Sequence, residues 1–98
     1  MILPREPKYS RHSYHLYVIR VNPKKRDKII EELRKENIFL GIYYPVPCHL
    51  QKVVLDRFER KKLLNTEKRV KEIISLPMYP NLTDDRAVRI AKLVKKLA

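Results

Sequence analysis

The segment GIYYPVPCHL, from Gly41 to Leu50, decides where the preceding strand ends and where the next element can begin. Each proline fixes its own φ and lacks a backbone N–H, so Pro45 and Pro47 end any preceding strand and hold the stretch from Tyr43 to His49 extended. We call Tyr43 to His49 the proline lip. A second proline-rich segment, SLPMYPNLT from Ser75 to Thr83, also joins an apolar run to a turn.

Two regular elements are expected before the proline lip, and a strand leads into it. YHLYVIRV, from Tyr14 to Val21, is dense in β-branched and aromatic residues, which predicts a central strand covered on both faces. Asn22 is a cap residue and Pro23 suits the first helical position, so a helix should run from there to about Asn37. A second strand is expected from Phe39 to Tyr44.

Beyond the proline lip the pattern becomes more helical. The stretch from His49 to Arg60 is open between helix and ordered loop. Thr66 can cap a further helix, after which the prolines of SLPMYP permit only a short edge strand. Thr83, followed by two acids, caps a last helix. The inward side chains of these two helices are expected to be Val70, Ile73 and Ile74, and then Ala87, Ile90, Ala91, Val94 and Leu97.

This order of elements predicts an α+β fold, a two-layer sandwich of a small, mostly antiparallel sheet with helices on one face. Residues 1–12 contain two prolines and several charges and are interpreted as a lead-in or linker, which leaves residues 13–98 as one domain. Apolar side chains at strand and helix spacing should form the core. They are Leu16, Val18, Ile29, Ile30, Leu33, Ile73, Ile74, Ile90 and Val94.

The net charge of +12 is typical of proteins with nucleic-acid or other anionic partners. From Lys24 to Glu36, however, basic residues alternate with acids as they do on a solvated helix face. A basic surplus remains between Arg57 and Lys71, without a Gly-rich clamp, zinc-finger spacing or aromatic RNA-binding motif. A free-standing basic module that binds nucleic acid or an acidic protein is therefore the alternative function.

Composition also indicates a compartment. No apolar run approaches the ~20 residues that span a bilayer, and the start MILPREPKYSRH lacks the apolar segment of a signal peptide. Cys48 is the single cysteine, which excludes an internal disulfide and fits a reducing compartment. We expect a cytoplasmic protein with no membrane partner. The abundance of Lys, Arg and Glu with one glycine resembles the usage of thermophile proteins.

A few side chains could bind metal or act as nucleophiles. His12, His15, Cys48 and His49 do not have the spacing of a structural zinc site. Cys48 and His49 are also a poor nucleophile and base, because neighbours along an extended segment point to opposite sides. We expect no metal site and no catalytic residue in this chain.

The succession HLYVIRV, RDKIIEELRKENI, GIYYPVPCHL and SLPMYPNLTDD resembles the C-terminal small domain of the DegT/DnrJ/EryC1/StrS family of sugar aminotransferases. The likeness extends from about Ser13 to Leu97. It depends on two motifs in matching order, G-I-x-Y-P-x-P-x-H-L at the proline lip and S-L-P-x-x-P from Ser75 to Pro80. The resemblance implies a pyridoxal-phosphate (PLP) enzyme of the aspartate aminotransferase fold, fold type I.

Such an enzyme transfers an amino group from glutamate or glutamine to a keto sugar carried on a nucleotide, and the cofactor supplies the chemistry. The family's Schiff-base lysine lies on a large domain, so this chain is expected to hold no cofactor and to be inactive alone.

The resemblance also implies substrate-positioning roles for Tyr43, Tyr44 and His49, with Tyr43 standing where many members have histidine. The alternative is that Tyr44 and His49 only satisfy polar groups of the turn. The large domain is the implied partner. Without it, the exposed docking surface predicts a homo-oligomer, a dimer or larger.

Overall fold

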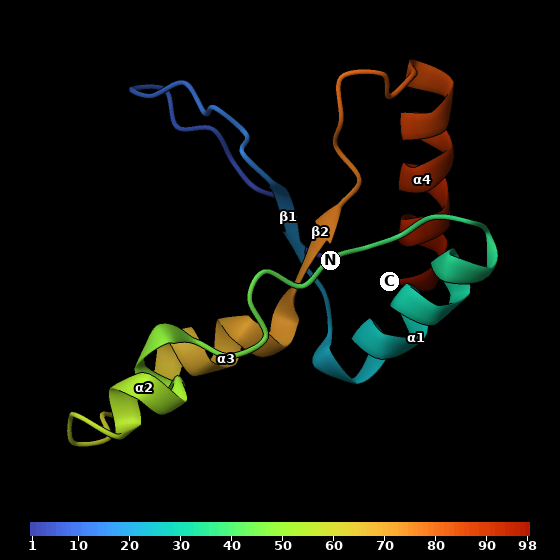
Figure 1. The fold of residues 1–98 in the computed structure, drawn as a ribbon. Helices are drawn as coiled ribbons and strands as arrows, with labels where there is room; N and C mark the ends of the chain where they lie inside the picture. The colour runs from blue at the N-terminus through green and yellow to red at the C-terminus, as the bar shows by residue number, and fades with distance from the viewer.

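The computed structural model describes all 98 residues of the chain, 1–98. A two-stranded antiparallel sheet lies at the centre of the molecule (Figure 1). Strand β1 (Tyr17–Arg20) pairs with strand β2 (Ile73–Leu76), and Ile19 stands directly opposite Ile74. The pairing brings together segments more than fifty residues apart in the sequence.

Helices surround this sheet unevenly. They are α1 (Pro23–Lys35), the 3-10 helix η1 (Cys48–Leu50), α2 (Lys52–Leu55), α3 (Leu64–Glu72) and α4 (Asp84–Leu97). Helices α1 and α4 lie side by side over one face of the sheet, whereas η1, α2 and α3 form an arm that projects away from it (Figure 1). We call residues 48–72 the arm. The predicted α+β class, with an antiparallel sheet, is confirmed.

One apolar cluster joins the inner face of the sheet to α1 and α4. Its buried members are Ile19, Val21, Ile29, Leu33, Ile38, Ile74, Ile90 and Val94, which include five of the predicted core residues. The other four, Leu16, Val18, Ile30 and Ile73, are only partly buried. Ile30 packs at the edge of the cluster. Val18 and Ile73 lie on the opposite face of the sheet, beside residues 2–4 and Arg69 of α3, so that face is covered only in part.

Helix α1 begins and ends close to the predicted positions. The Asn22 side chain caps its start, with proline at the first helical position. At its end Asn37 adopts a φ of 58°, and the Ile38 N–H donates to the Leu33 carbonyl at 2.9 Å, the Schellman arrangement. The turn buries Ile38, a core residue that the helical pattern did not include.

The strand predicted from Phe39 to Tyr44 is wrong. Only Gly41 pairs with the sheet: it donates to the Ser75 carbonyl at 3.1 Å and accepts from the Ser75 N–H at 2.7 Å. Because Pro45 and Pro47 have no N–H to donate, the chain leaves the edge of β2 for the proline lip after this single pair.

The first strand is shorter than the predicted Tyr14 to Val21. Tyr14 has a φ of 48°, which interrupts the extended backbone before β1 begins. The outer edge of β1 is instead extended by Ile2, which exchanges hydrogen bonds of 2.8 and 2.9 Å with Arg20. Residue 2, within the predicted lead-in, thus adds to the sheet.

Helix α3 differs from its prediction at both ends. Thr66 lies inside the first turn and is not the cap; the Glu67 carboxylate instead accepts from the Leu63 N–H at 3.1 Å. Ile73 and Ile74, predicted inside the helix, begin β2. Two consecutive β-branched residues pack better on a pleated strand than in a helix, and pairing with β1 is available to them.

Helix α4 follows its prediction, since Thr83 Oγ1 accepts from the Arg86 N–H at 3.4 Å. One inward residue is wrong: Ala91 is exposed, and Leu93 packs against the core instead. The stretch from His49 to Arg60, left open between helix and loop, contains the end of η1 and the single turn of α2.

The molecule is elongated, with both the N-terminal segment and the arm projecting from the sheet (Figure 1). The Cα radius of gyration is 15.6 Å, against about 13 Å for a compact domain of this length. Apolar side chains stay exposed along the arm, at Val53, Leu55, Phe58, Leu63 and Leu64.

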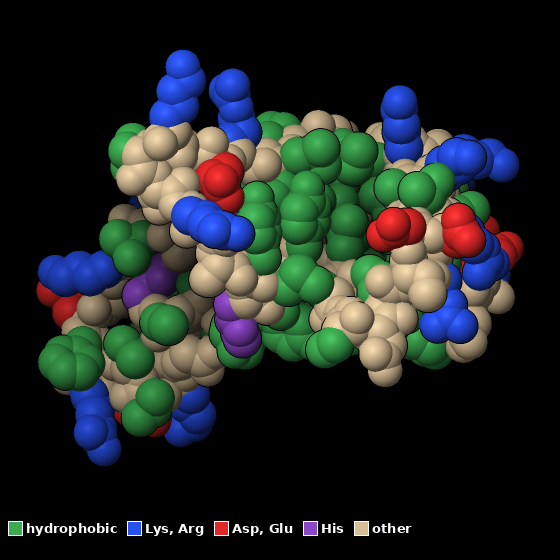
Figure 2. All heavy atoms as spheres, turned by 90° about the horizontal axis from the view of Figure 1, so that it is seen from above, with side chains coloured by type: hydrophobic (Ala, Val, Ile, Leu, Met, Phe, Trp, Pro, Cys, Tyr) green, Lys and Arg blue, Asp and Glu red, His purple; other side chains and the backbone are tan.

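Figure 2 shows apolar side chains gathered over the middle of one face, with Lys and Arg side chains around its rim. None of the helices has the length and apolar character needed to span a bilayer.

Candidate functional site

The proline lip follows Gly41, the residue that pairs with the edge of β2. We call the face of the sheet opposite α1 and α4 the open face. A Cβ added to Gly41 would lie 2.8 Å from Tyr43 Cζ, closer than packing permits, so the Tyr43 ring can approach only a glycine. Gly41 pairs with Ser75, and paired residues place their side chains on the same face. Ser75 stands opposite Val18, so the Tyr43 ring lies on the open face.

Tyr43 and Tyr44 come together at the start of the proline lip. Their ring centroids are 5.8 Å apart with an interplanar angle of 76°, an edge-to-face contact. Their exposed fractions are 48% and 70%, so both phenol rings remain accessible. The two rings therefore form a surface on which a ligand could lie, with phenol hydroxyls that can donate or accept.

His49 is directed away from this pair, toward α3. Its Nε2 donates to Glu67 Oε1 at 3.0 Å, and the same oxygen accepts from the Leu63 N–H at 3.1 Å. Because a carboxylate can only accept, the proton of this hydrogen bond lies on Nε2. The structure thus gathers two of the three predicted substrate-binding residues and places the third, His49, against α3.

The pair between His49 and Glu67 is also an electrostatic one. The hydrogen bond from His49, followed by that from the Leu63 N–H, holds the pKa of Glu67 below its ordinary value. Glu67 is therefore ionised at neutral pH and fixes the orientation of the imidazole. The sequence alone contains no signal for this partner, which lies eighteen residues away on another helix.

A second residue that the sequence did not single out is Ser75. It is only 4% exposed, and its hydroxyl has no hydrogen-bond partner within the chain. Its side chain shares the open face with Tyr43 and Val18. Buried hydroxyls normally have a hydrogen-bond partner, so the unpaired Ser75 hydroxyl is an exception on this face, and it is not accessible to a ligand in this structure.

Pyridoxal phosphate needs a desolvated lysine for its Schiff base, and the residues present do not fit it. Every lysine of the chain is exposed. The one lysine with a shifted pKa is Lys35, and its hydrogen bond to Glu32 raises that pKa instead of lowering it. No three His, Cys, Asp or Glu side chains lie close enough together to hold a metal ion.

Several solved structures with a similar fold are described as aminotransferases. A DegT/DnrJ/EryC1/StrS aminotransferase from Brucella abortus is 28% identical with a TM-score of 0.85, over 97% of this chain and 25% of that one. NtdA from Bacillus subtilis, solved with the cofactor PMP, is 29% identical with a TM-score of 0.78, over 88% of this chain and 20% of that one. PseC from Helicobacter pylori, an aminotransferase involved in pseudoaminic acid biosynthesis, is 28% identical with a TM-score of 0.74. The match covers 85% of this chain and 23% of PseC.

The fold is therefore that of a segment of a fold-type I aminotransferase. The sequence profile of the DegT/DnrJ/EryC1/StrS aminotransferase family matches residues 1–95, and the chain belongs to this family.

Curated relatives show the same partial coverage. An uncharacterised protein of Methanocaldococcus jannaschii is 36% identical over 99% of this chain and 26% of its own length. A pleiotropic regulatory protein of Geobacillus stearothermophilus is 36% identical over 88% of this chain and 23% of its own. The chain thus spans about a quarter of the length of the relatives it matches.

Proposed function

We propose that these residues form the C-terminal small domain of a PLP-dependent nucleotide-sugar aminotransferase, which transfers an amino group from glutamate or glutamine to a keto sugar. One observation carries the proposal. Almost all of this chain, 97%, superimposes on a quarter (25%) of the Brucella abortus structure with a TM-score of 0.85. The role of the Helicobacter pylori relative in pseudoaminic acid biosynthesis supports a substrate of the sugar class.

Within that enzyme the chain supplies positioning. Tyr43 and Tyr44 contact the substrate from the open face of the sheet, and His49, oriented by Glu67, holds the proline lip in place beside them. PLP, bound by the large domain, supplies the amino-transfer chemistry. The chain is inactive by itself, because none of its lysines lies in a desolvated pocket.

The exposed apolar side chains of the arm are the docking surface for the large domain, whether that domain belongs to the same polypeptide or to another. Left uncovered, the same surface drives self-association into a dimer or larger oligomer. Sedimentation of a monomer at high concentration would count against this. The exposed thiol of Cys48 suits the reducing cytoplasm.

The experiment is capture of a partner from the native lysate, followed by borohydride reduction and mass spectrometry. Borohydride fixes the PLP Schiff base to its lysine, so the label identifies the polypeptide that carries the cofactor. We expect the label on a captured large-domain polypeptide and none on this chain. A label on one of this chain's own lysines, or capture of nucleic acid alone with steep salt dependence, would overturn the proposal.

Matched variants locate the docking surface. Leu64→Asp places a charge on the arm, where Leu64 is 67% exposed, and should abolish capture of the labelled polypeptide. Val88→Asp places the same charge on α4, where Val88 is 51% exposed, and should leave capture intact. Equal losses in the two variants would contradict docking through the arm.

A further inference from the structure

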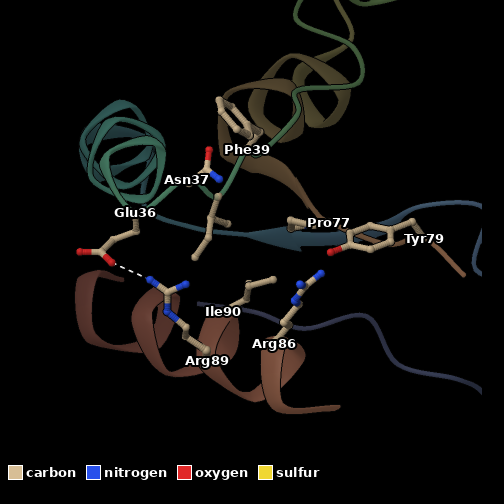
Figure 3. Close-up of a pocket in the computed structure, with 9 residues that line it drawn as sticks. Glu36, Asn37, Phe39, Pro77, Tyr79, Arg86, Arg89 and Ile90 are labelled. Carbon is tan, nitrogen blue, oxygen red and sulfur yellow. Dashed lines mark hydrogen bonds and ion pairs between the residues drawn. The ribbon is translucent and has the colours of Figure 1, made fainter. Parts of the chain in front are cut away.

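An open cavity of about 620 Å³ lies between the end of α1, the segment after β2 and the first turns of α4 (Figure 3). This volume is within the range of small-molecule sites, roughly 300–1,000 Å³. Its polar lining comes from Glu36, Asn37, Tyr79, Arg86 and Arg89. It shares no residue with the proline lip or the arm, so it is not the site described above.

The walls of the cavity are fixed by the backbone. Asn37 closes the end of α1 in the Schellman turn, which directs the chain past the rim. On the opposite wall, the Leu82 N–H donates to the Tyr79 carbonyl at 3.0 Å. Thr83 caps the turn of α4 that carries Arg86. The cavity is therefore formed by turns that exist before any ligand binds.

The two arginines of the cavity differ in their partners. Arg89 Nη2 pairs with Glu36 Oε2 at 2.7 Å, which neutralises it. The Arg86 guanidinium has no carboxylate or carbonyl partner in the chain and points into the cavity toward Tyr79 (Figure 3). Asp84 and Asp85 precede Arg86 on the same helix, but neither lines the cavity. One uncompensated positive charge therefore faces the cavity, with a fork of donors that suits an oxyanion.

The remaining lining is apolar and partly aromatic. Phe39 and Tyr79 line the cavity with exposed fractions of 65% and 45%. The buried Ile90 side chain of α4 also lines it. Exposed aromatic rings beside a free guanidinium match a ligand with a planar apolar body and one anionic end.

We propose that this cavity binds a small organic oxyanion, a carboxylate or a phosphate carried on a planar apolar body. Arg86 pairs with the oxyanion, the Tyr79 hydroxyl lies within the same cavity as a second donor, and Phe39 contacts the apolar body. The inference does not depend on the aminotransferase proposal, because the cavity needs neither a large domain nor PLP.

The test is a nuclear magnetic resonance titration of the uniformly ¹⁵N-labelled 98-residue chain. The probes are phenyl phosphate and benzoate, with benzyl alcohol as the neutral control of the same ring. We expect saturable shifts of the Phe39, Tyr79 and Arg86 amides with at least one oxyanion and much weaker binding of the alcohol. The tighter of the two oxyanions identifies whether the natural group is a phosphate or a carboxylate.

Three surface variants separate a built site from general attraction to a basic protein. Arg86→Gln should weaken binding roughly tenfold to a hundredfold, the range for a hydrogen-bonded charge pair. Lys92→Gln removes the same charge from an exposed position of α4 outside the cavity and should leave affinity unchanged. Glu36→Gln releases Arg89 and should strengthen binding.

The outcomes are distinct. Absence of saturable binding by both oxyanions overturns the proposal, as does equal weakening by Arg86→Gln and Lys92→Gln. Dispersed core resonances in each variant spectrum show that a lost affinity is not a lost fold.

Discussion

The half of the molecule built from α1, α4 and the inner face of the sheet differs from the arm in what holds it together. In the first half, side chains such as Ile19, Leu33 and Ile74 are completely buried in one apolar cluster. In the arm the only buried residue is Glu72, and large apolar side chains such as Phe58 face solvent. The first half contains the apolar core, whereas the arm leaves apolar side chains uncovered, which is the surface that we propose another domain covers.

Polar contacts attach the arm to the rest of the chain. Arg26 Nη1 donates to the Val70 carbonyl at 2.7 Å, which joins α1 to α3. Glu72 Oε2 accepts from Arg20 Nε and from Arg69 Nη1, each at 2.9 Å, at the boundary between α3 and β2. Such contacts are directional and charge-dependent, unlike the apolar core, and this difference can be tested by mutation.

The largest effect is expected from Leu33→Ala in α1. Leu33 is 0% exposed, and truncating a buried leucine leaves a cavity that costs about 2–5 kcal/mol of unfolding free energy. Urea denaturation measures the loss. The control is Leu64→Ala in the arm, which should change stability by less than about 0.5 kcal/mol because Leu64 is exposed. If the two variants lost equal stability, the contrast between the halves would be wrong.

The second test concerns the pH dependence of stability that arises from Glu72, whose ion pairs link the arm to the sheet. The hydrogen bond from Arg69, aided by that from Arg20, holds the pKa of Glu72 below its ordinary value. Its contribution to stability is therefore complete above the unfolded value of about 4.3 and is lost as the pH falls through the lower folded value. Glu72→Gln should reduce the drop in the urea midpoint between about pH 7 and about pH 3.

The exposed Glu59 supplies the control for that experiment, because its carboxylate pairs only with the exposed Lys61. Glu59→Gln should leave the pH dependence of the urea midpoint as it is in the parent chain. An unchanged pH dependence in Glu72→Gln would show that Glu72 does not join the arm to the sheet.

A smaller effect separates a true helix cap from an apparent one. Thr83→Ala removes the hydroxyl that accepts from the Arg86 N–H and should cost about 1 kcal/mol. Thr66→Ala alters an exposed threonine within the first turn of α3 and should cost much less. Thermal unfolding of both variants ranks them. A reversed ranking would restore the cap that the sequence predicted at Thr66.

The smallest global effect is expected from His49→Ala. The substitution removes the bond to Glu67, so amides of η1 and α2 should exchange with solvent faster. Amides of α1 and α4 should keep their exchange rates, because the apolar cluster does not involve His49. Hydrogen exchange followed by mass spectrometry resolves the two regions. Faster exchange throughout the molecule would mean that the proline lip supports the whole fold.

Capping preferences and helical spacing correctly predicted those features of the fold that depend on residues close together in the sequence. Asn22 and Thr83 act as caps where the residue type indicated them, and helical spacing identified Leu33 and Val94 as core. The rules failed where pairing partners decide the outcome. Ile73 and Ile74 continue a helical pattern, yet β1 is available to pair with them, and the resulting strand replaces a turn of helix.

The candidate site shows the same division. The prolines indicated a rigid segment carrying Tyr43, Tyr44 and His49, and the segment leaves the sheet at Gly41. The partner of His49 and the unpartnered hydroxyl of Ser75 depend on how α3 and the sheet approach the proline lip. No spacing within the sequence contains that information.

The measurement that tests the central claim most directly is hydrogen exchange of the chain alone and of the chain bound to the PLP-labelled polypeptide that it captures. We predict that the arm exchanges rapidly in the free chain and becomes protected in the complex, while α1 and α4 are protected in both. An arm already as protected as α1 in the free chain, or one left unprotected in the complex, would contradict the account.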